Sequence, residues 1–165
     1  MGEDRETDCA RTCEMKGDVY IIDTSIFMYA RGKGHHYKDL CAGLVLAIGD
    51  GSFEQKYGQP VVDSEVFQEI LYRYSLIGQW DTAISLLQDI YALNMDILPV
   101  AKGEIGRMIE LATKYKDGHI TPRNLVHVAV MLTNNIKKII STDKDFDRIE
   151  EIQRIDPADF SNVFV

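Results

Sequence analysis

The 165-residue sequence predicts an α/β protein with a mainly parallel sheet of about five strands and helices on both faces. Two observations support this fold class. Short apolar runs alternate along the chain with longer segments whose apolar residues recur every three to four positions. The first run, residues 19–22, shows no alternation of polar and apolar residues, which is typical of a strand covered on both faces.

The remaining strands are expected from similar short apolar runs. Residues 60–62 predict a brief strand or a turn, and residues 95–100 predict a buried strand. Residues 138–142 form another apolar strand, and residues 151–155 predict a short final strand before Pro157. Because helical segments separate these runs, neighbouring strands are expected to lie parallel.

Helix starts are marked by capping residues. Thr24 and Ser25 follow the first strand and offer N-cap chemistry, as does Ser64 for a later helix. The clearest start is Thr121-Pro122, an N-cap residue followed by proline at the first helical position. Beyond the segment after Ser25, helices are predicted over residues 37–49, 64–75, 80–93, 103–116 and 122–134.

Composition and charge exclude several classes of protein. A net charge of −8 argues against a protein that coats nucleic acid non-specifically. The longest nearly pure apolar run, residues 40–48, is much shorter than the roughly 20 residues of a membrane span. Residues 1–17 are expected to be a flexible polar leader rather than a secretory signal, and residues 18–165 a single domain. Three cysteines (Cys9, Cys13 and Cys41) are too few for a disulfide framework and predict a reducing cytoplasm.

Acidic residues follow two of the predicted strands. Asp23 comes directly after the first strand, and Asp143 and Asp145 come after the strand at 138–142. In parallel α/β sheets, ligands bind beyond the carboxyl ends of the strands. Taken singly, Asp23 could be a helix N-cap and the other two could form a turn. Glu69 lies within the apolar sector of its helix, where a carboxylate is costly unless it has a partner.

Together these acids indicate a metal site. Carboxylates that converge on one edge repel each other unless a cation or proton compensates them. Mg²⁺ and Mn²⁺ prefer oxygen ligands, and such a site can activate water and stabilise charge on a phosphate. The chain has no dinucleotide-binding glycine motif, Walker loop, nucleophile-elbow serine or His-Glu-x-x-His pair. After these exclusions, the chemistry that is left is phosphodiester hydrolysis by a metal ion held on carboxylates.

Four segments resemble, in order, the motifs of PIN domains, the fold of VapC-type toxin ribonucleases. They are Val-Tyr-Ile-Ile-Asp-Thr-Ser at 19–25 and the segments 62–72, 120–129 and 138–147, and the similarity covers about residues 18–157. The resemblance implies a small three-layer α/β/α sandwich, an acidic Mg²⁺ or Mn²⁺ site and endoribonuclease activity. It also places the family's second acid on Glu69 rather than on Glu65.

One position departs from the family pattern. The family usually carries Asp where this sequence has Asn124, at the start of the helix after Thr121. An asparagine can coordinate a metal through its carbonyl oxygen, but it supplies neither charge nor a base. The resemblance implies catalytic roles for Asp23, Glu69, Asn124 and Asp143. It implies metal ligation by Asp23, Glu69 and Asp143, with assistance from Asp145.

Further residues are candidates for contact with the substrate. Arg31 and Lys33 belong to a basic, glycine-containing loop after the first helix, which could reach a phosphate backbone near the metal or could simply be solvated. Thr24 and Ser141 could orient water at the metal, or serve as capping and turn residues. For His127, three residues after the asparagine, a packing or hydrogen-bonding role is expected.

The leading hypothesis is a metal-dependent endoribonuclease with an RNA substrate, as in the toxin of a toxin–antitoxin pair. The resemblance then implies an antitoxin partner and a homodimer, while the cysteine count and the short apolar runs predict a cytoplasmic location and no membrane association. The alternative is a catalytically degenerate RNA- or protein-binding module on the same scaffold, because of Asn124. A phosphatase-like or receiver-type protein is a weaker alternative, since no second acid follows Asp23 closely.

Overall fold

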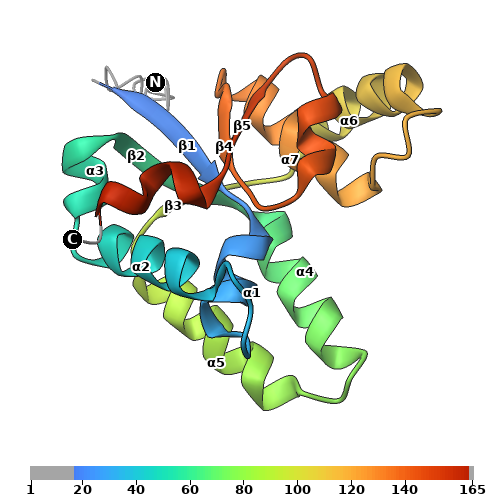
Figure 1. Cartoon of the computed structure of the whole chain (residues 1–165). Coiled ribbons are helices and arrows are strands. Elements are labelled where there is room, and N and C mark those ends of the chain that lie inside the picture. The colour runs from blue at the N-terminus through green and yellow to red at the C-terminus, as the bar shows by residue number, and fades with distance from the viewer. Residues whose placement is uncertain (1–16, 164–165) are drawn as a thin grey trace, which may run out of the picture.

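The computed structural model describes residues 17–163 and contains a sheet of five parallel strands. The strands are β1 (Asp18–Ile22), β2 (Gly58–Asp63), β3 (Asp96–Leu98), β4 (Lys138–Ile140) and β5 (Gln153–Ile155). Their order is β3-β2-β1-β4-β5, so the strand order reverses beside β1 (Figure 1). The predicted leader, with Cys9 and Cys13, lies outside the described residues apart from Gly17.

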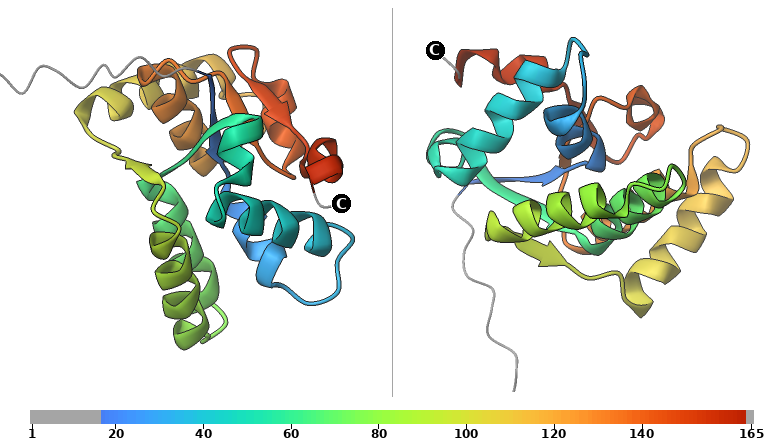
Figure 2. Two further views of the ribbon diagram at one scale, coloured as in Figure 1. Left: turned by 90° about the vertical axis from the view of Figure 1, so that its left-hand side faces the viewer. Right: turned by 90° about the horizontal axis from the view of Figure 1, so that it is seen from below.

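Helices connect successive strands within the described range. The α-helices are α1 (Thr24–Arg31), α2 (Lys38–Gly49), α3 (Ser52–Lys56), α4 (Ser64–Ser75), α5 (Trp80–Ala92), α6 (Lys102–Tyr115) and α7 (Pro122–Thr133). Two 3₁₀ helices, η1 (Lys144–Arg148) and η2 (Pro157–Val163), lie near the C-terminus. Helices α4 and α5 pack against each other and project together beyond the sheet (Figures 1 and 2). Across residues 17–163, the helices are all too short or too polar to cross a membrane.

Two hydrophobic clusters cover the two faces of the sheet. Tyr20 and Ile22 of β1 pack on one face with α1 to α5 and η2, whereas Ile21 packs on the other with α6 and α7. Successive side chains of a strand point to opposite faces, so a strand buried on both faces must be apolar throughout. The predicted three-layer α/β/α sandwich is therefore confirmed.

Strands β2 and β3 differ from their predicted character. The brief strand or turn expected at 60–62 is part of a six-residue strand, β2, which lies between β1 and β3. The strand predicted within residues 95–100 is present, but the prediction that it is buried is wrong. The central residues of this segment form the edge strand β3, which pairs with β2 alone, and Ile97 is 40% exposed. Apolar composition did not distinguish an edge strand from an interior one.

The N-cap residue of α7 is the one predicted from the sequence, whereas that of α4 is not. The Thr121 hydroxyl accepts a hydrogen bond from the Asn124 backbone N–H at 3.3 Å, and Pro122 occupies the first turn, as predicted. At α4 the cap is Asp63 rather than the predicted Ser64, because an Asp63 carboxylate oxygen accepts from the first backbone N–H groups of the helix. The structure thus places a buried acid at the end of a third strand.

Replacing Thr121 with alanine is expected to lower the free energy of unfolding by about 1 kcal/mol, because one N–H at the start of α7 loses its acceptor. Urea denaturation measures the change. Thr133→Ala, at the other end of the same helix, removes a hydroxyl that bonds only to the Ala129 carbonyl and should cost less. An equal loss in both variants would contradict the capping role.

Candidate metal-binding cleft

A cleft of about 670 Å³ opens at the carboxyl ends of β1 and β4, where the strand order reverses. Elements that are distant in the sequence form its walls: α1, the loop after it, α4, the start of α7 and the segment after β4. Residues from these elements that line the cleft include Asp23, Glu69, Arg73, Arg123, Asn124 and Asp143. The topology therefore brings most of the predicted acids to one place.

At the floor of the cleft, Asp23 and Glu69 form a buried cluster with His127, which lies behind them and does not itself line the cleft. Each offers one ligand atom, and these atoms lie within 4.8 Å of one another. The His127 Nε2 atom is 3.7 Å from Asp23 Oδ1 and 3.8 Å from Glu69 Oε2. His127 is completely buried, and sequence reasoning had given it only a packing or hydrogen-bonding role.

The His127 ring is held from behind by Asp63. The His127 Nδ1 atom lies 2.7 Å from Asp63 Oδ2, and both side chains are fully buried. Burial lowers the pKa of His127, but the charge and hydrogen bond of Asp63 outweigh it, so the pKa stands well above its usual value. We therefore treat His127 as an imidazolium that compensates surrounding carboxylates. Sequence reasoning missed Asp63, although an acid directly after Val61-Val62 repeats the pattern seen at Asp23.

Two serines fix the carboxylate of Asp23. Ser25 Oγ and Ser141 Oγ each donate a hydrogen bond to Asp23 Oδ2 at 2.6 Å. Ser141 Oγ also accepts from the Asp143 backbone N–H at 3.0 Å, which joins the ends of β1 and β4. Ser141 is fully buried, so it positions the acids instead of lining the cleft. Thr24 is buried too, and its hydroxyl has no hydrogen-bond partner among residues 17–163.

Asn124 and Asp143 face each other across the cleft wall. Asn124 Nδ2 donates to Asp143 Oδ2 at 2.9 Å, and Asp143 Oδ1 accepts from the Asp145 backbone N–H at 2.9 Å. Asp143 lines the cleft but is not part of the buried three-residue cluster. The Asp145 side chain lies 3.5 Å from the Arg148 guanidinium and is absent from the residues that line the cleft. The structure thus separates Asp145 from the other predicted metal ligands.

Arginine side chains surround Glu69. Arg73, one helical turn further along α4, places Nε at 2.8 Å and Nη2 at 2.7 Å from Glu69 Oε1. Arg123 Nη1 lies 3.6 Å from the same oxygen. Burial raises the pKa of Glu69, but the nearby cationic groups of His127 and Arg73 outweigh it and lower the pKa to about 2. Sequence reasoning missed both arginines, although a Glu and an Arg four residues apart on a helix are a readable signal.

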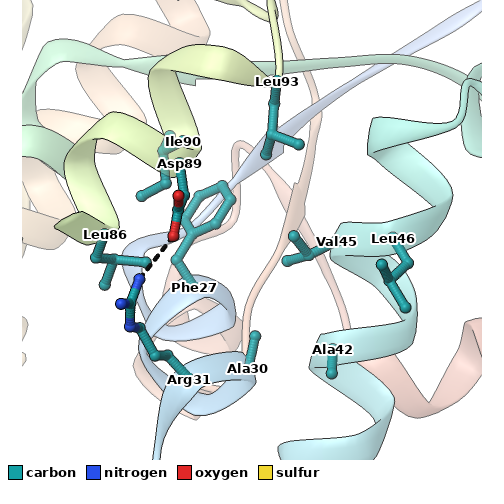
Figure 3. Close-up of a pocket in the computed structure, with 10 residues that line it drawn as sticks. All are labelled: Phe27, Ala30, Arg31, Ala42, Val45, Leu46, Leu86, Asp89, Ile90 and Leu93. Carbon is teal, nitrogen blue, oxygen red and sulfur yellow. Dashed lines mark hydrogen bonds and ion pairs between the residues drawn. The ribbon is translucent and has the colours of Figure 1, made fainter.

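The two basic residues predicted to bind substrate lie in different cavities. Lys33 lines the cleft beside the acids. Arg31 instead turns toward α5, where it bonds to the Asp89 carboxylate at 2.6 Å (Figure 3). It also donates to Ser85 Oγ at 2.9 Å. It lies at the edge of a mostly apolar groove of about 400 Å³ between α1, α2 and α5, to which Phe27 and Leu46 contribute (Figure 3).

Comparison with known proteins identifies the family. Residues 20–152 match the PIN domain. The chain belongs to the PIN domain family. The resemblance of its four motifs to PIN domains is therefore confirmed, and its all-parallel five-stranded sheet is a PIN-like fold.

Two curated relatives of this PIN domain come from mycobacteria. They are the VapC ribonuclease Mb1869c of Mycobacterium bovis and ribonuclease VapC13 of Mycobacterium tuberculosis. Each is 27% identical over 138 residues, which cover 83% of this chain and 99% of the relative. This PIN domain is therefore similar to these ribonucleases over almost their whole length.

Solved structures share the fold at lower identity. VapBC2 of Rickettsia felis, bound to a promoter DNA fragment, matches with a TM-score of 0.65 at 18% identity, covering 84% of this chain and 98% of that one. VapC20 of Mycobacterium tuberculosis, a toxin that cleaves the sarcin–ricin loop, matches with a TM-score of 0.65 at 13% identity, covering 81% and 96%. These matches show that the PIN fold extends over most of the described chain.

Proposed function

We propose that this PIN domain is a metal-dependent endoribonuclease that acts as the toxin of a toxin–antitoxin pair. The observation that carries the proposal is the buried cluster of Asp23, Glu69 and His127 at the floor of a cleft whose walls also bear cationic side chains. An acidic floor suits a divalent cation, and cationic walls suit a phosphate backbone. The names of the two mycobacterial relatives, both called ribonucleases, support the same function.

The donor atoms of the cleft fit Mg²⁺ or Mn²⁺. Asp23 and Glu69 supply buried carboxylate oxygens, and Asp143 and the carbonyl oxygen of Asn124 supply further hard ligands at the wall. As an imidazolium, His127 would direct its Nε2–H toward the carboxylates of Asp23 and Glu69, 3.7 and 3.8 Å away, and would not itself be a ligand, so the ion would be held by oxygen atoms alone. When bound, the ion would activate water and stabilise charge on the phosphate.

The remaining residues would orient the reacting groups. Ser25 and Ser141 hold one oxygen of Asp23, which leaves Oδ1 directed toward the cluster. His127, fixed by Asp63, keeps the two buried carboxylates at a constant separation. The Thr24 hydroxyl is available to hold a water molecule at the floor, because no described residue bonds to it. In this arrangement Asp145 assists only indirectly, through its backbone contact with Asp143.

Asp23→Asn is expected to lower the rate of RNA cleavage at least about 100-fold, because a charged ligand oxygen is lost from the cluster. Cleavage of a labelled single-stranded RNA with Mn²⁺, with Mg²⁺ and with EDTA measures the effect. Asp89→Asn is the matched control, since this acid pairs with Arg31 outside the cleft. Equal cleavage by wild type and Asp23→Asn would indicate a contaminating nuclease and reject the proposal.

A degenerate binding module is the second candidate function. The hydrogen bond from Asn124 Nδ2 to Asp143 Oδ2 favours it, because that bond occupies an oxygen otherwise available to a metal. In this case the cleft would bind RNA or protein without cleaving it. The two candidates differ in whether the wild-type protein binds Mn²⁺.

We further propose an antitoxin protein and a second copy of this chain as partners. Structures with matching folds include VapBC toxin–antitoxin complexes, such as VapBC-5 of Mycobacterium tuberculosis. The apolar groove of Figure 3 and the 71% exposed Leu46 at its edge support contact with another protein. Light scattering of the purified chain tests for the second copy. The same measurement on the chain co-expressed with the small protein encoded by the adjacent reading frame tests for the antitoxin.

A further inference from the structure

Two arginine side chains approach the same carboxylate oxygen of Glu69. Arg73 and Arg123 both approach Oε1, while Oε2 faces the His127 ring. Two guanidinium groups therefore converge on one oxygen of one carboxylate. Because one carboxylate oxygen accepts few hydrogen bonds, two guanidinium groups that share it keep donors for a further anion.

The two arginines are also accessible from the cleft. Both line it, and their side chains are 50% and 33% exposed. The Nη1 atom of Arg123 is nevertheless buried and has no hydrogen-bond partner among residues 17–163, while its guanidinium lies 5.6 Å from the centre of the Tyr72 ring. A planar guanidinium with unused donors is well suited to bind a phosphate through two hydrogen bonds.

We propose that Arg73 and Arg123 form a clamp for a phosphodiester group of the RNA strand and rest on Glu69 Oε1 when no RNA is bound. The clamp rests on the proposed ribonuclease function and names the residues that would hold the backbone in the cleft. In this role Arg73 and Arg123 bind a phosphate of the RNA strand and thereby position the strand in the cleft.

A coupling between RNA and metal follows from the shared oxygen. While the arginines contact Glu69 Oε1, their charge opposes a divalent cation at that carboxylate. A phosphate that draws the guanidinium groups away would free the oxygen and add negative charge beside the ion. RNA and metal should therefore strengthen each other's binding by the same factor.

Binding of RNA without metal tests the clamp directly. The probe is a short fluorescent 2′-O-methyl oligoribonucleotide, which resists cleavage, measured by anisotropy in EDTA. We expect Arg73→Gln and Arg123→Gln each to weaken RNA binding about tenfold. Each should also reduce the slope of log affinity against log salt concentration by about one, because one phosphate contact is lost. The matched control is Arg107→Gln, whose side chain is 48% exposed and pairs with Glu110 at 2.7 Å outside the cleft. Its affinity should equal that of wild type.

Calorimetric titration with Mn²⁺ tests the coupling. Without RNA, Arg73→Gln should bind Mn²⁺ about tenfold more tightly than wild type, because a cation next to Glu69 is removed. The oligonucleotide should tighten Mn²⁺ binding by wild type and have a smaller effect on Arg73→Gln. A purely structural role of Arg73 predicts weaker Mn²⁺ binding in the variant instead, and that result would overturn the proposal.

The outcomes separate the clamp from the proposed function. Loss of oligonucleotide binding in Arg73→Gln and Arg123→Gln, together with no cleavage by wild type, would support the clamp and reject the nuclease. Cleavage by wild type with unchanged oligonucleotide binding in both variants would reject the clamp and keep the nuclease. Thermal unfolding of each variant checks its folding, and the two positions, on α4 and α7, provide independent variants.

Discussion

Replacing Asn124 with aspartate is expected to tighten Mn²⁺ binding about 10- to 100-fold and to raise RNA cleavage. In the structure, Asn124 Nδ2 donates to Asp143 Oδ2 at 2.9 Å. An aspartate would put a second carboxylate oxygen at this position, where like charges repel unless a cation lies between them. The variant would thereby restore the acid that PIN domains usually carry and convert a hydrogen bond into a pair of metal ligands.

The same substitution should destabilise the metal-free protein. Loss of the hydrogen bond and repulsion between the two acids are expected to lower the free energy of unfolding by about 1–3 kcal/mol in EDTA. Saturating Mn²⁺ should reverse the loss, because a ligand that binds only the folded state stabilises it. Calorimetry with Mn²⁺ and thermal unfolding with and without EDTA measure the two effects.

The control for added charge is Asn135→Asp, which lies at the exposed end of α7 with a φ of 55° that aspartate tolerates. It should change neither metal affinity nor cleavage. If Asn124→Asp binds Mn²⁺ no better than Asn135→Asp, the site assignment of position 124 is wrong. If only Asn124→Asp binds Mn²⁺, the natural chain is the degenerate module; if wild type already binds Mn²⁺ and cleaves RNA, that alternative fails.

The parts of this fold that were predictable are those fixed by local sequence. Unbroken apolar runs predict strands buried on both faces, and the Thr121-Pro122 pair predicts the start of α7. The edge position of β3 was not predictable, because an apolar run does not say how many neighbours its strand has. The cap of α4 was misassigned for a related reason. Asp63 and Ser64 are both good N-cap residues, and only the φ and ψ angles at the junction decide between them.

The candidate site was predictable where acids follow strands and less so where tertiary packing decides. Asp23 and Asp143 could be placed at one edge of the sheet from sequence alone, although their roles as ligands stay predictions. The pairing of Arg31 with Asp89 was hidden, since no local pattern shows that α5 lies beside α1. The role of His127 was hidden too, because its partner Asp63 is 64 residues away in the sequence.

Replacing Asp63 with alanine is expected to cost about 3–5 kcal/mol of the free energy of unfolding, the largest loss of stability predicted for this chain. The variant loses the N-cap of α4 and leaves the fully buried His127 ring without the carboxylate that lies 2.7 Å away. Asp63→Asn should cost less, because the amide oxygen can still cap the helix. Urea denaturation of the two variants measures the difference.

The dependence of this loss on pH tests whether His127 is charged. Because the pKa of His127 is raised above its unfolded value of about 6.5, the ring stabilises the folded state fully below about pH 6.5, and this contribution falls as pH rises through the folded pKa. Without Asp63, burial disfavours the charged ring, so the difference between wild type and Asp63→Ala should be greatest near about pH 6 and smaller in alkaline solution. A loss that is the same at both pH values would mean that His127 is neutral in the folded protein. Asp23 would then lack a cationic ring beside it, whereas Glu69 would keep Arg73 at 2.7 Å as its counter-ion.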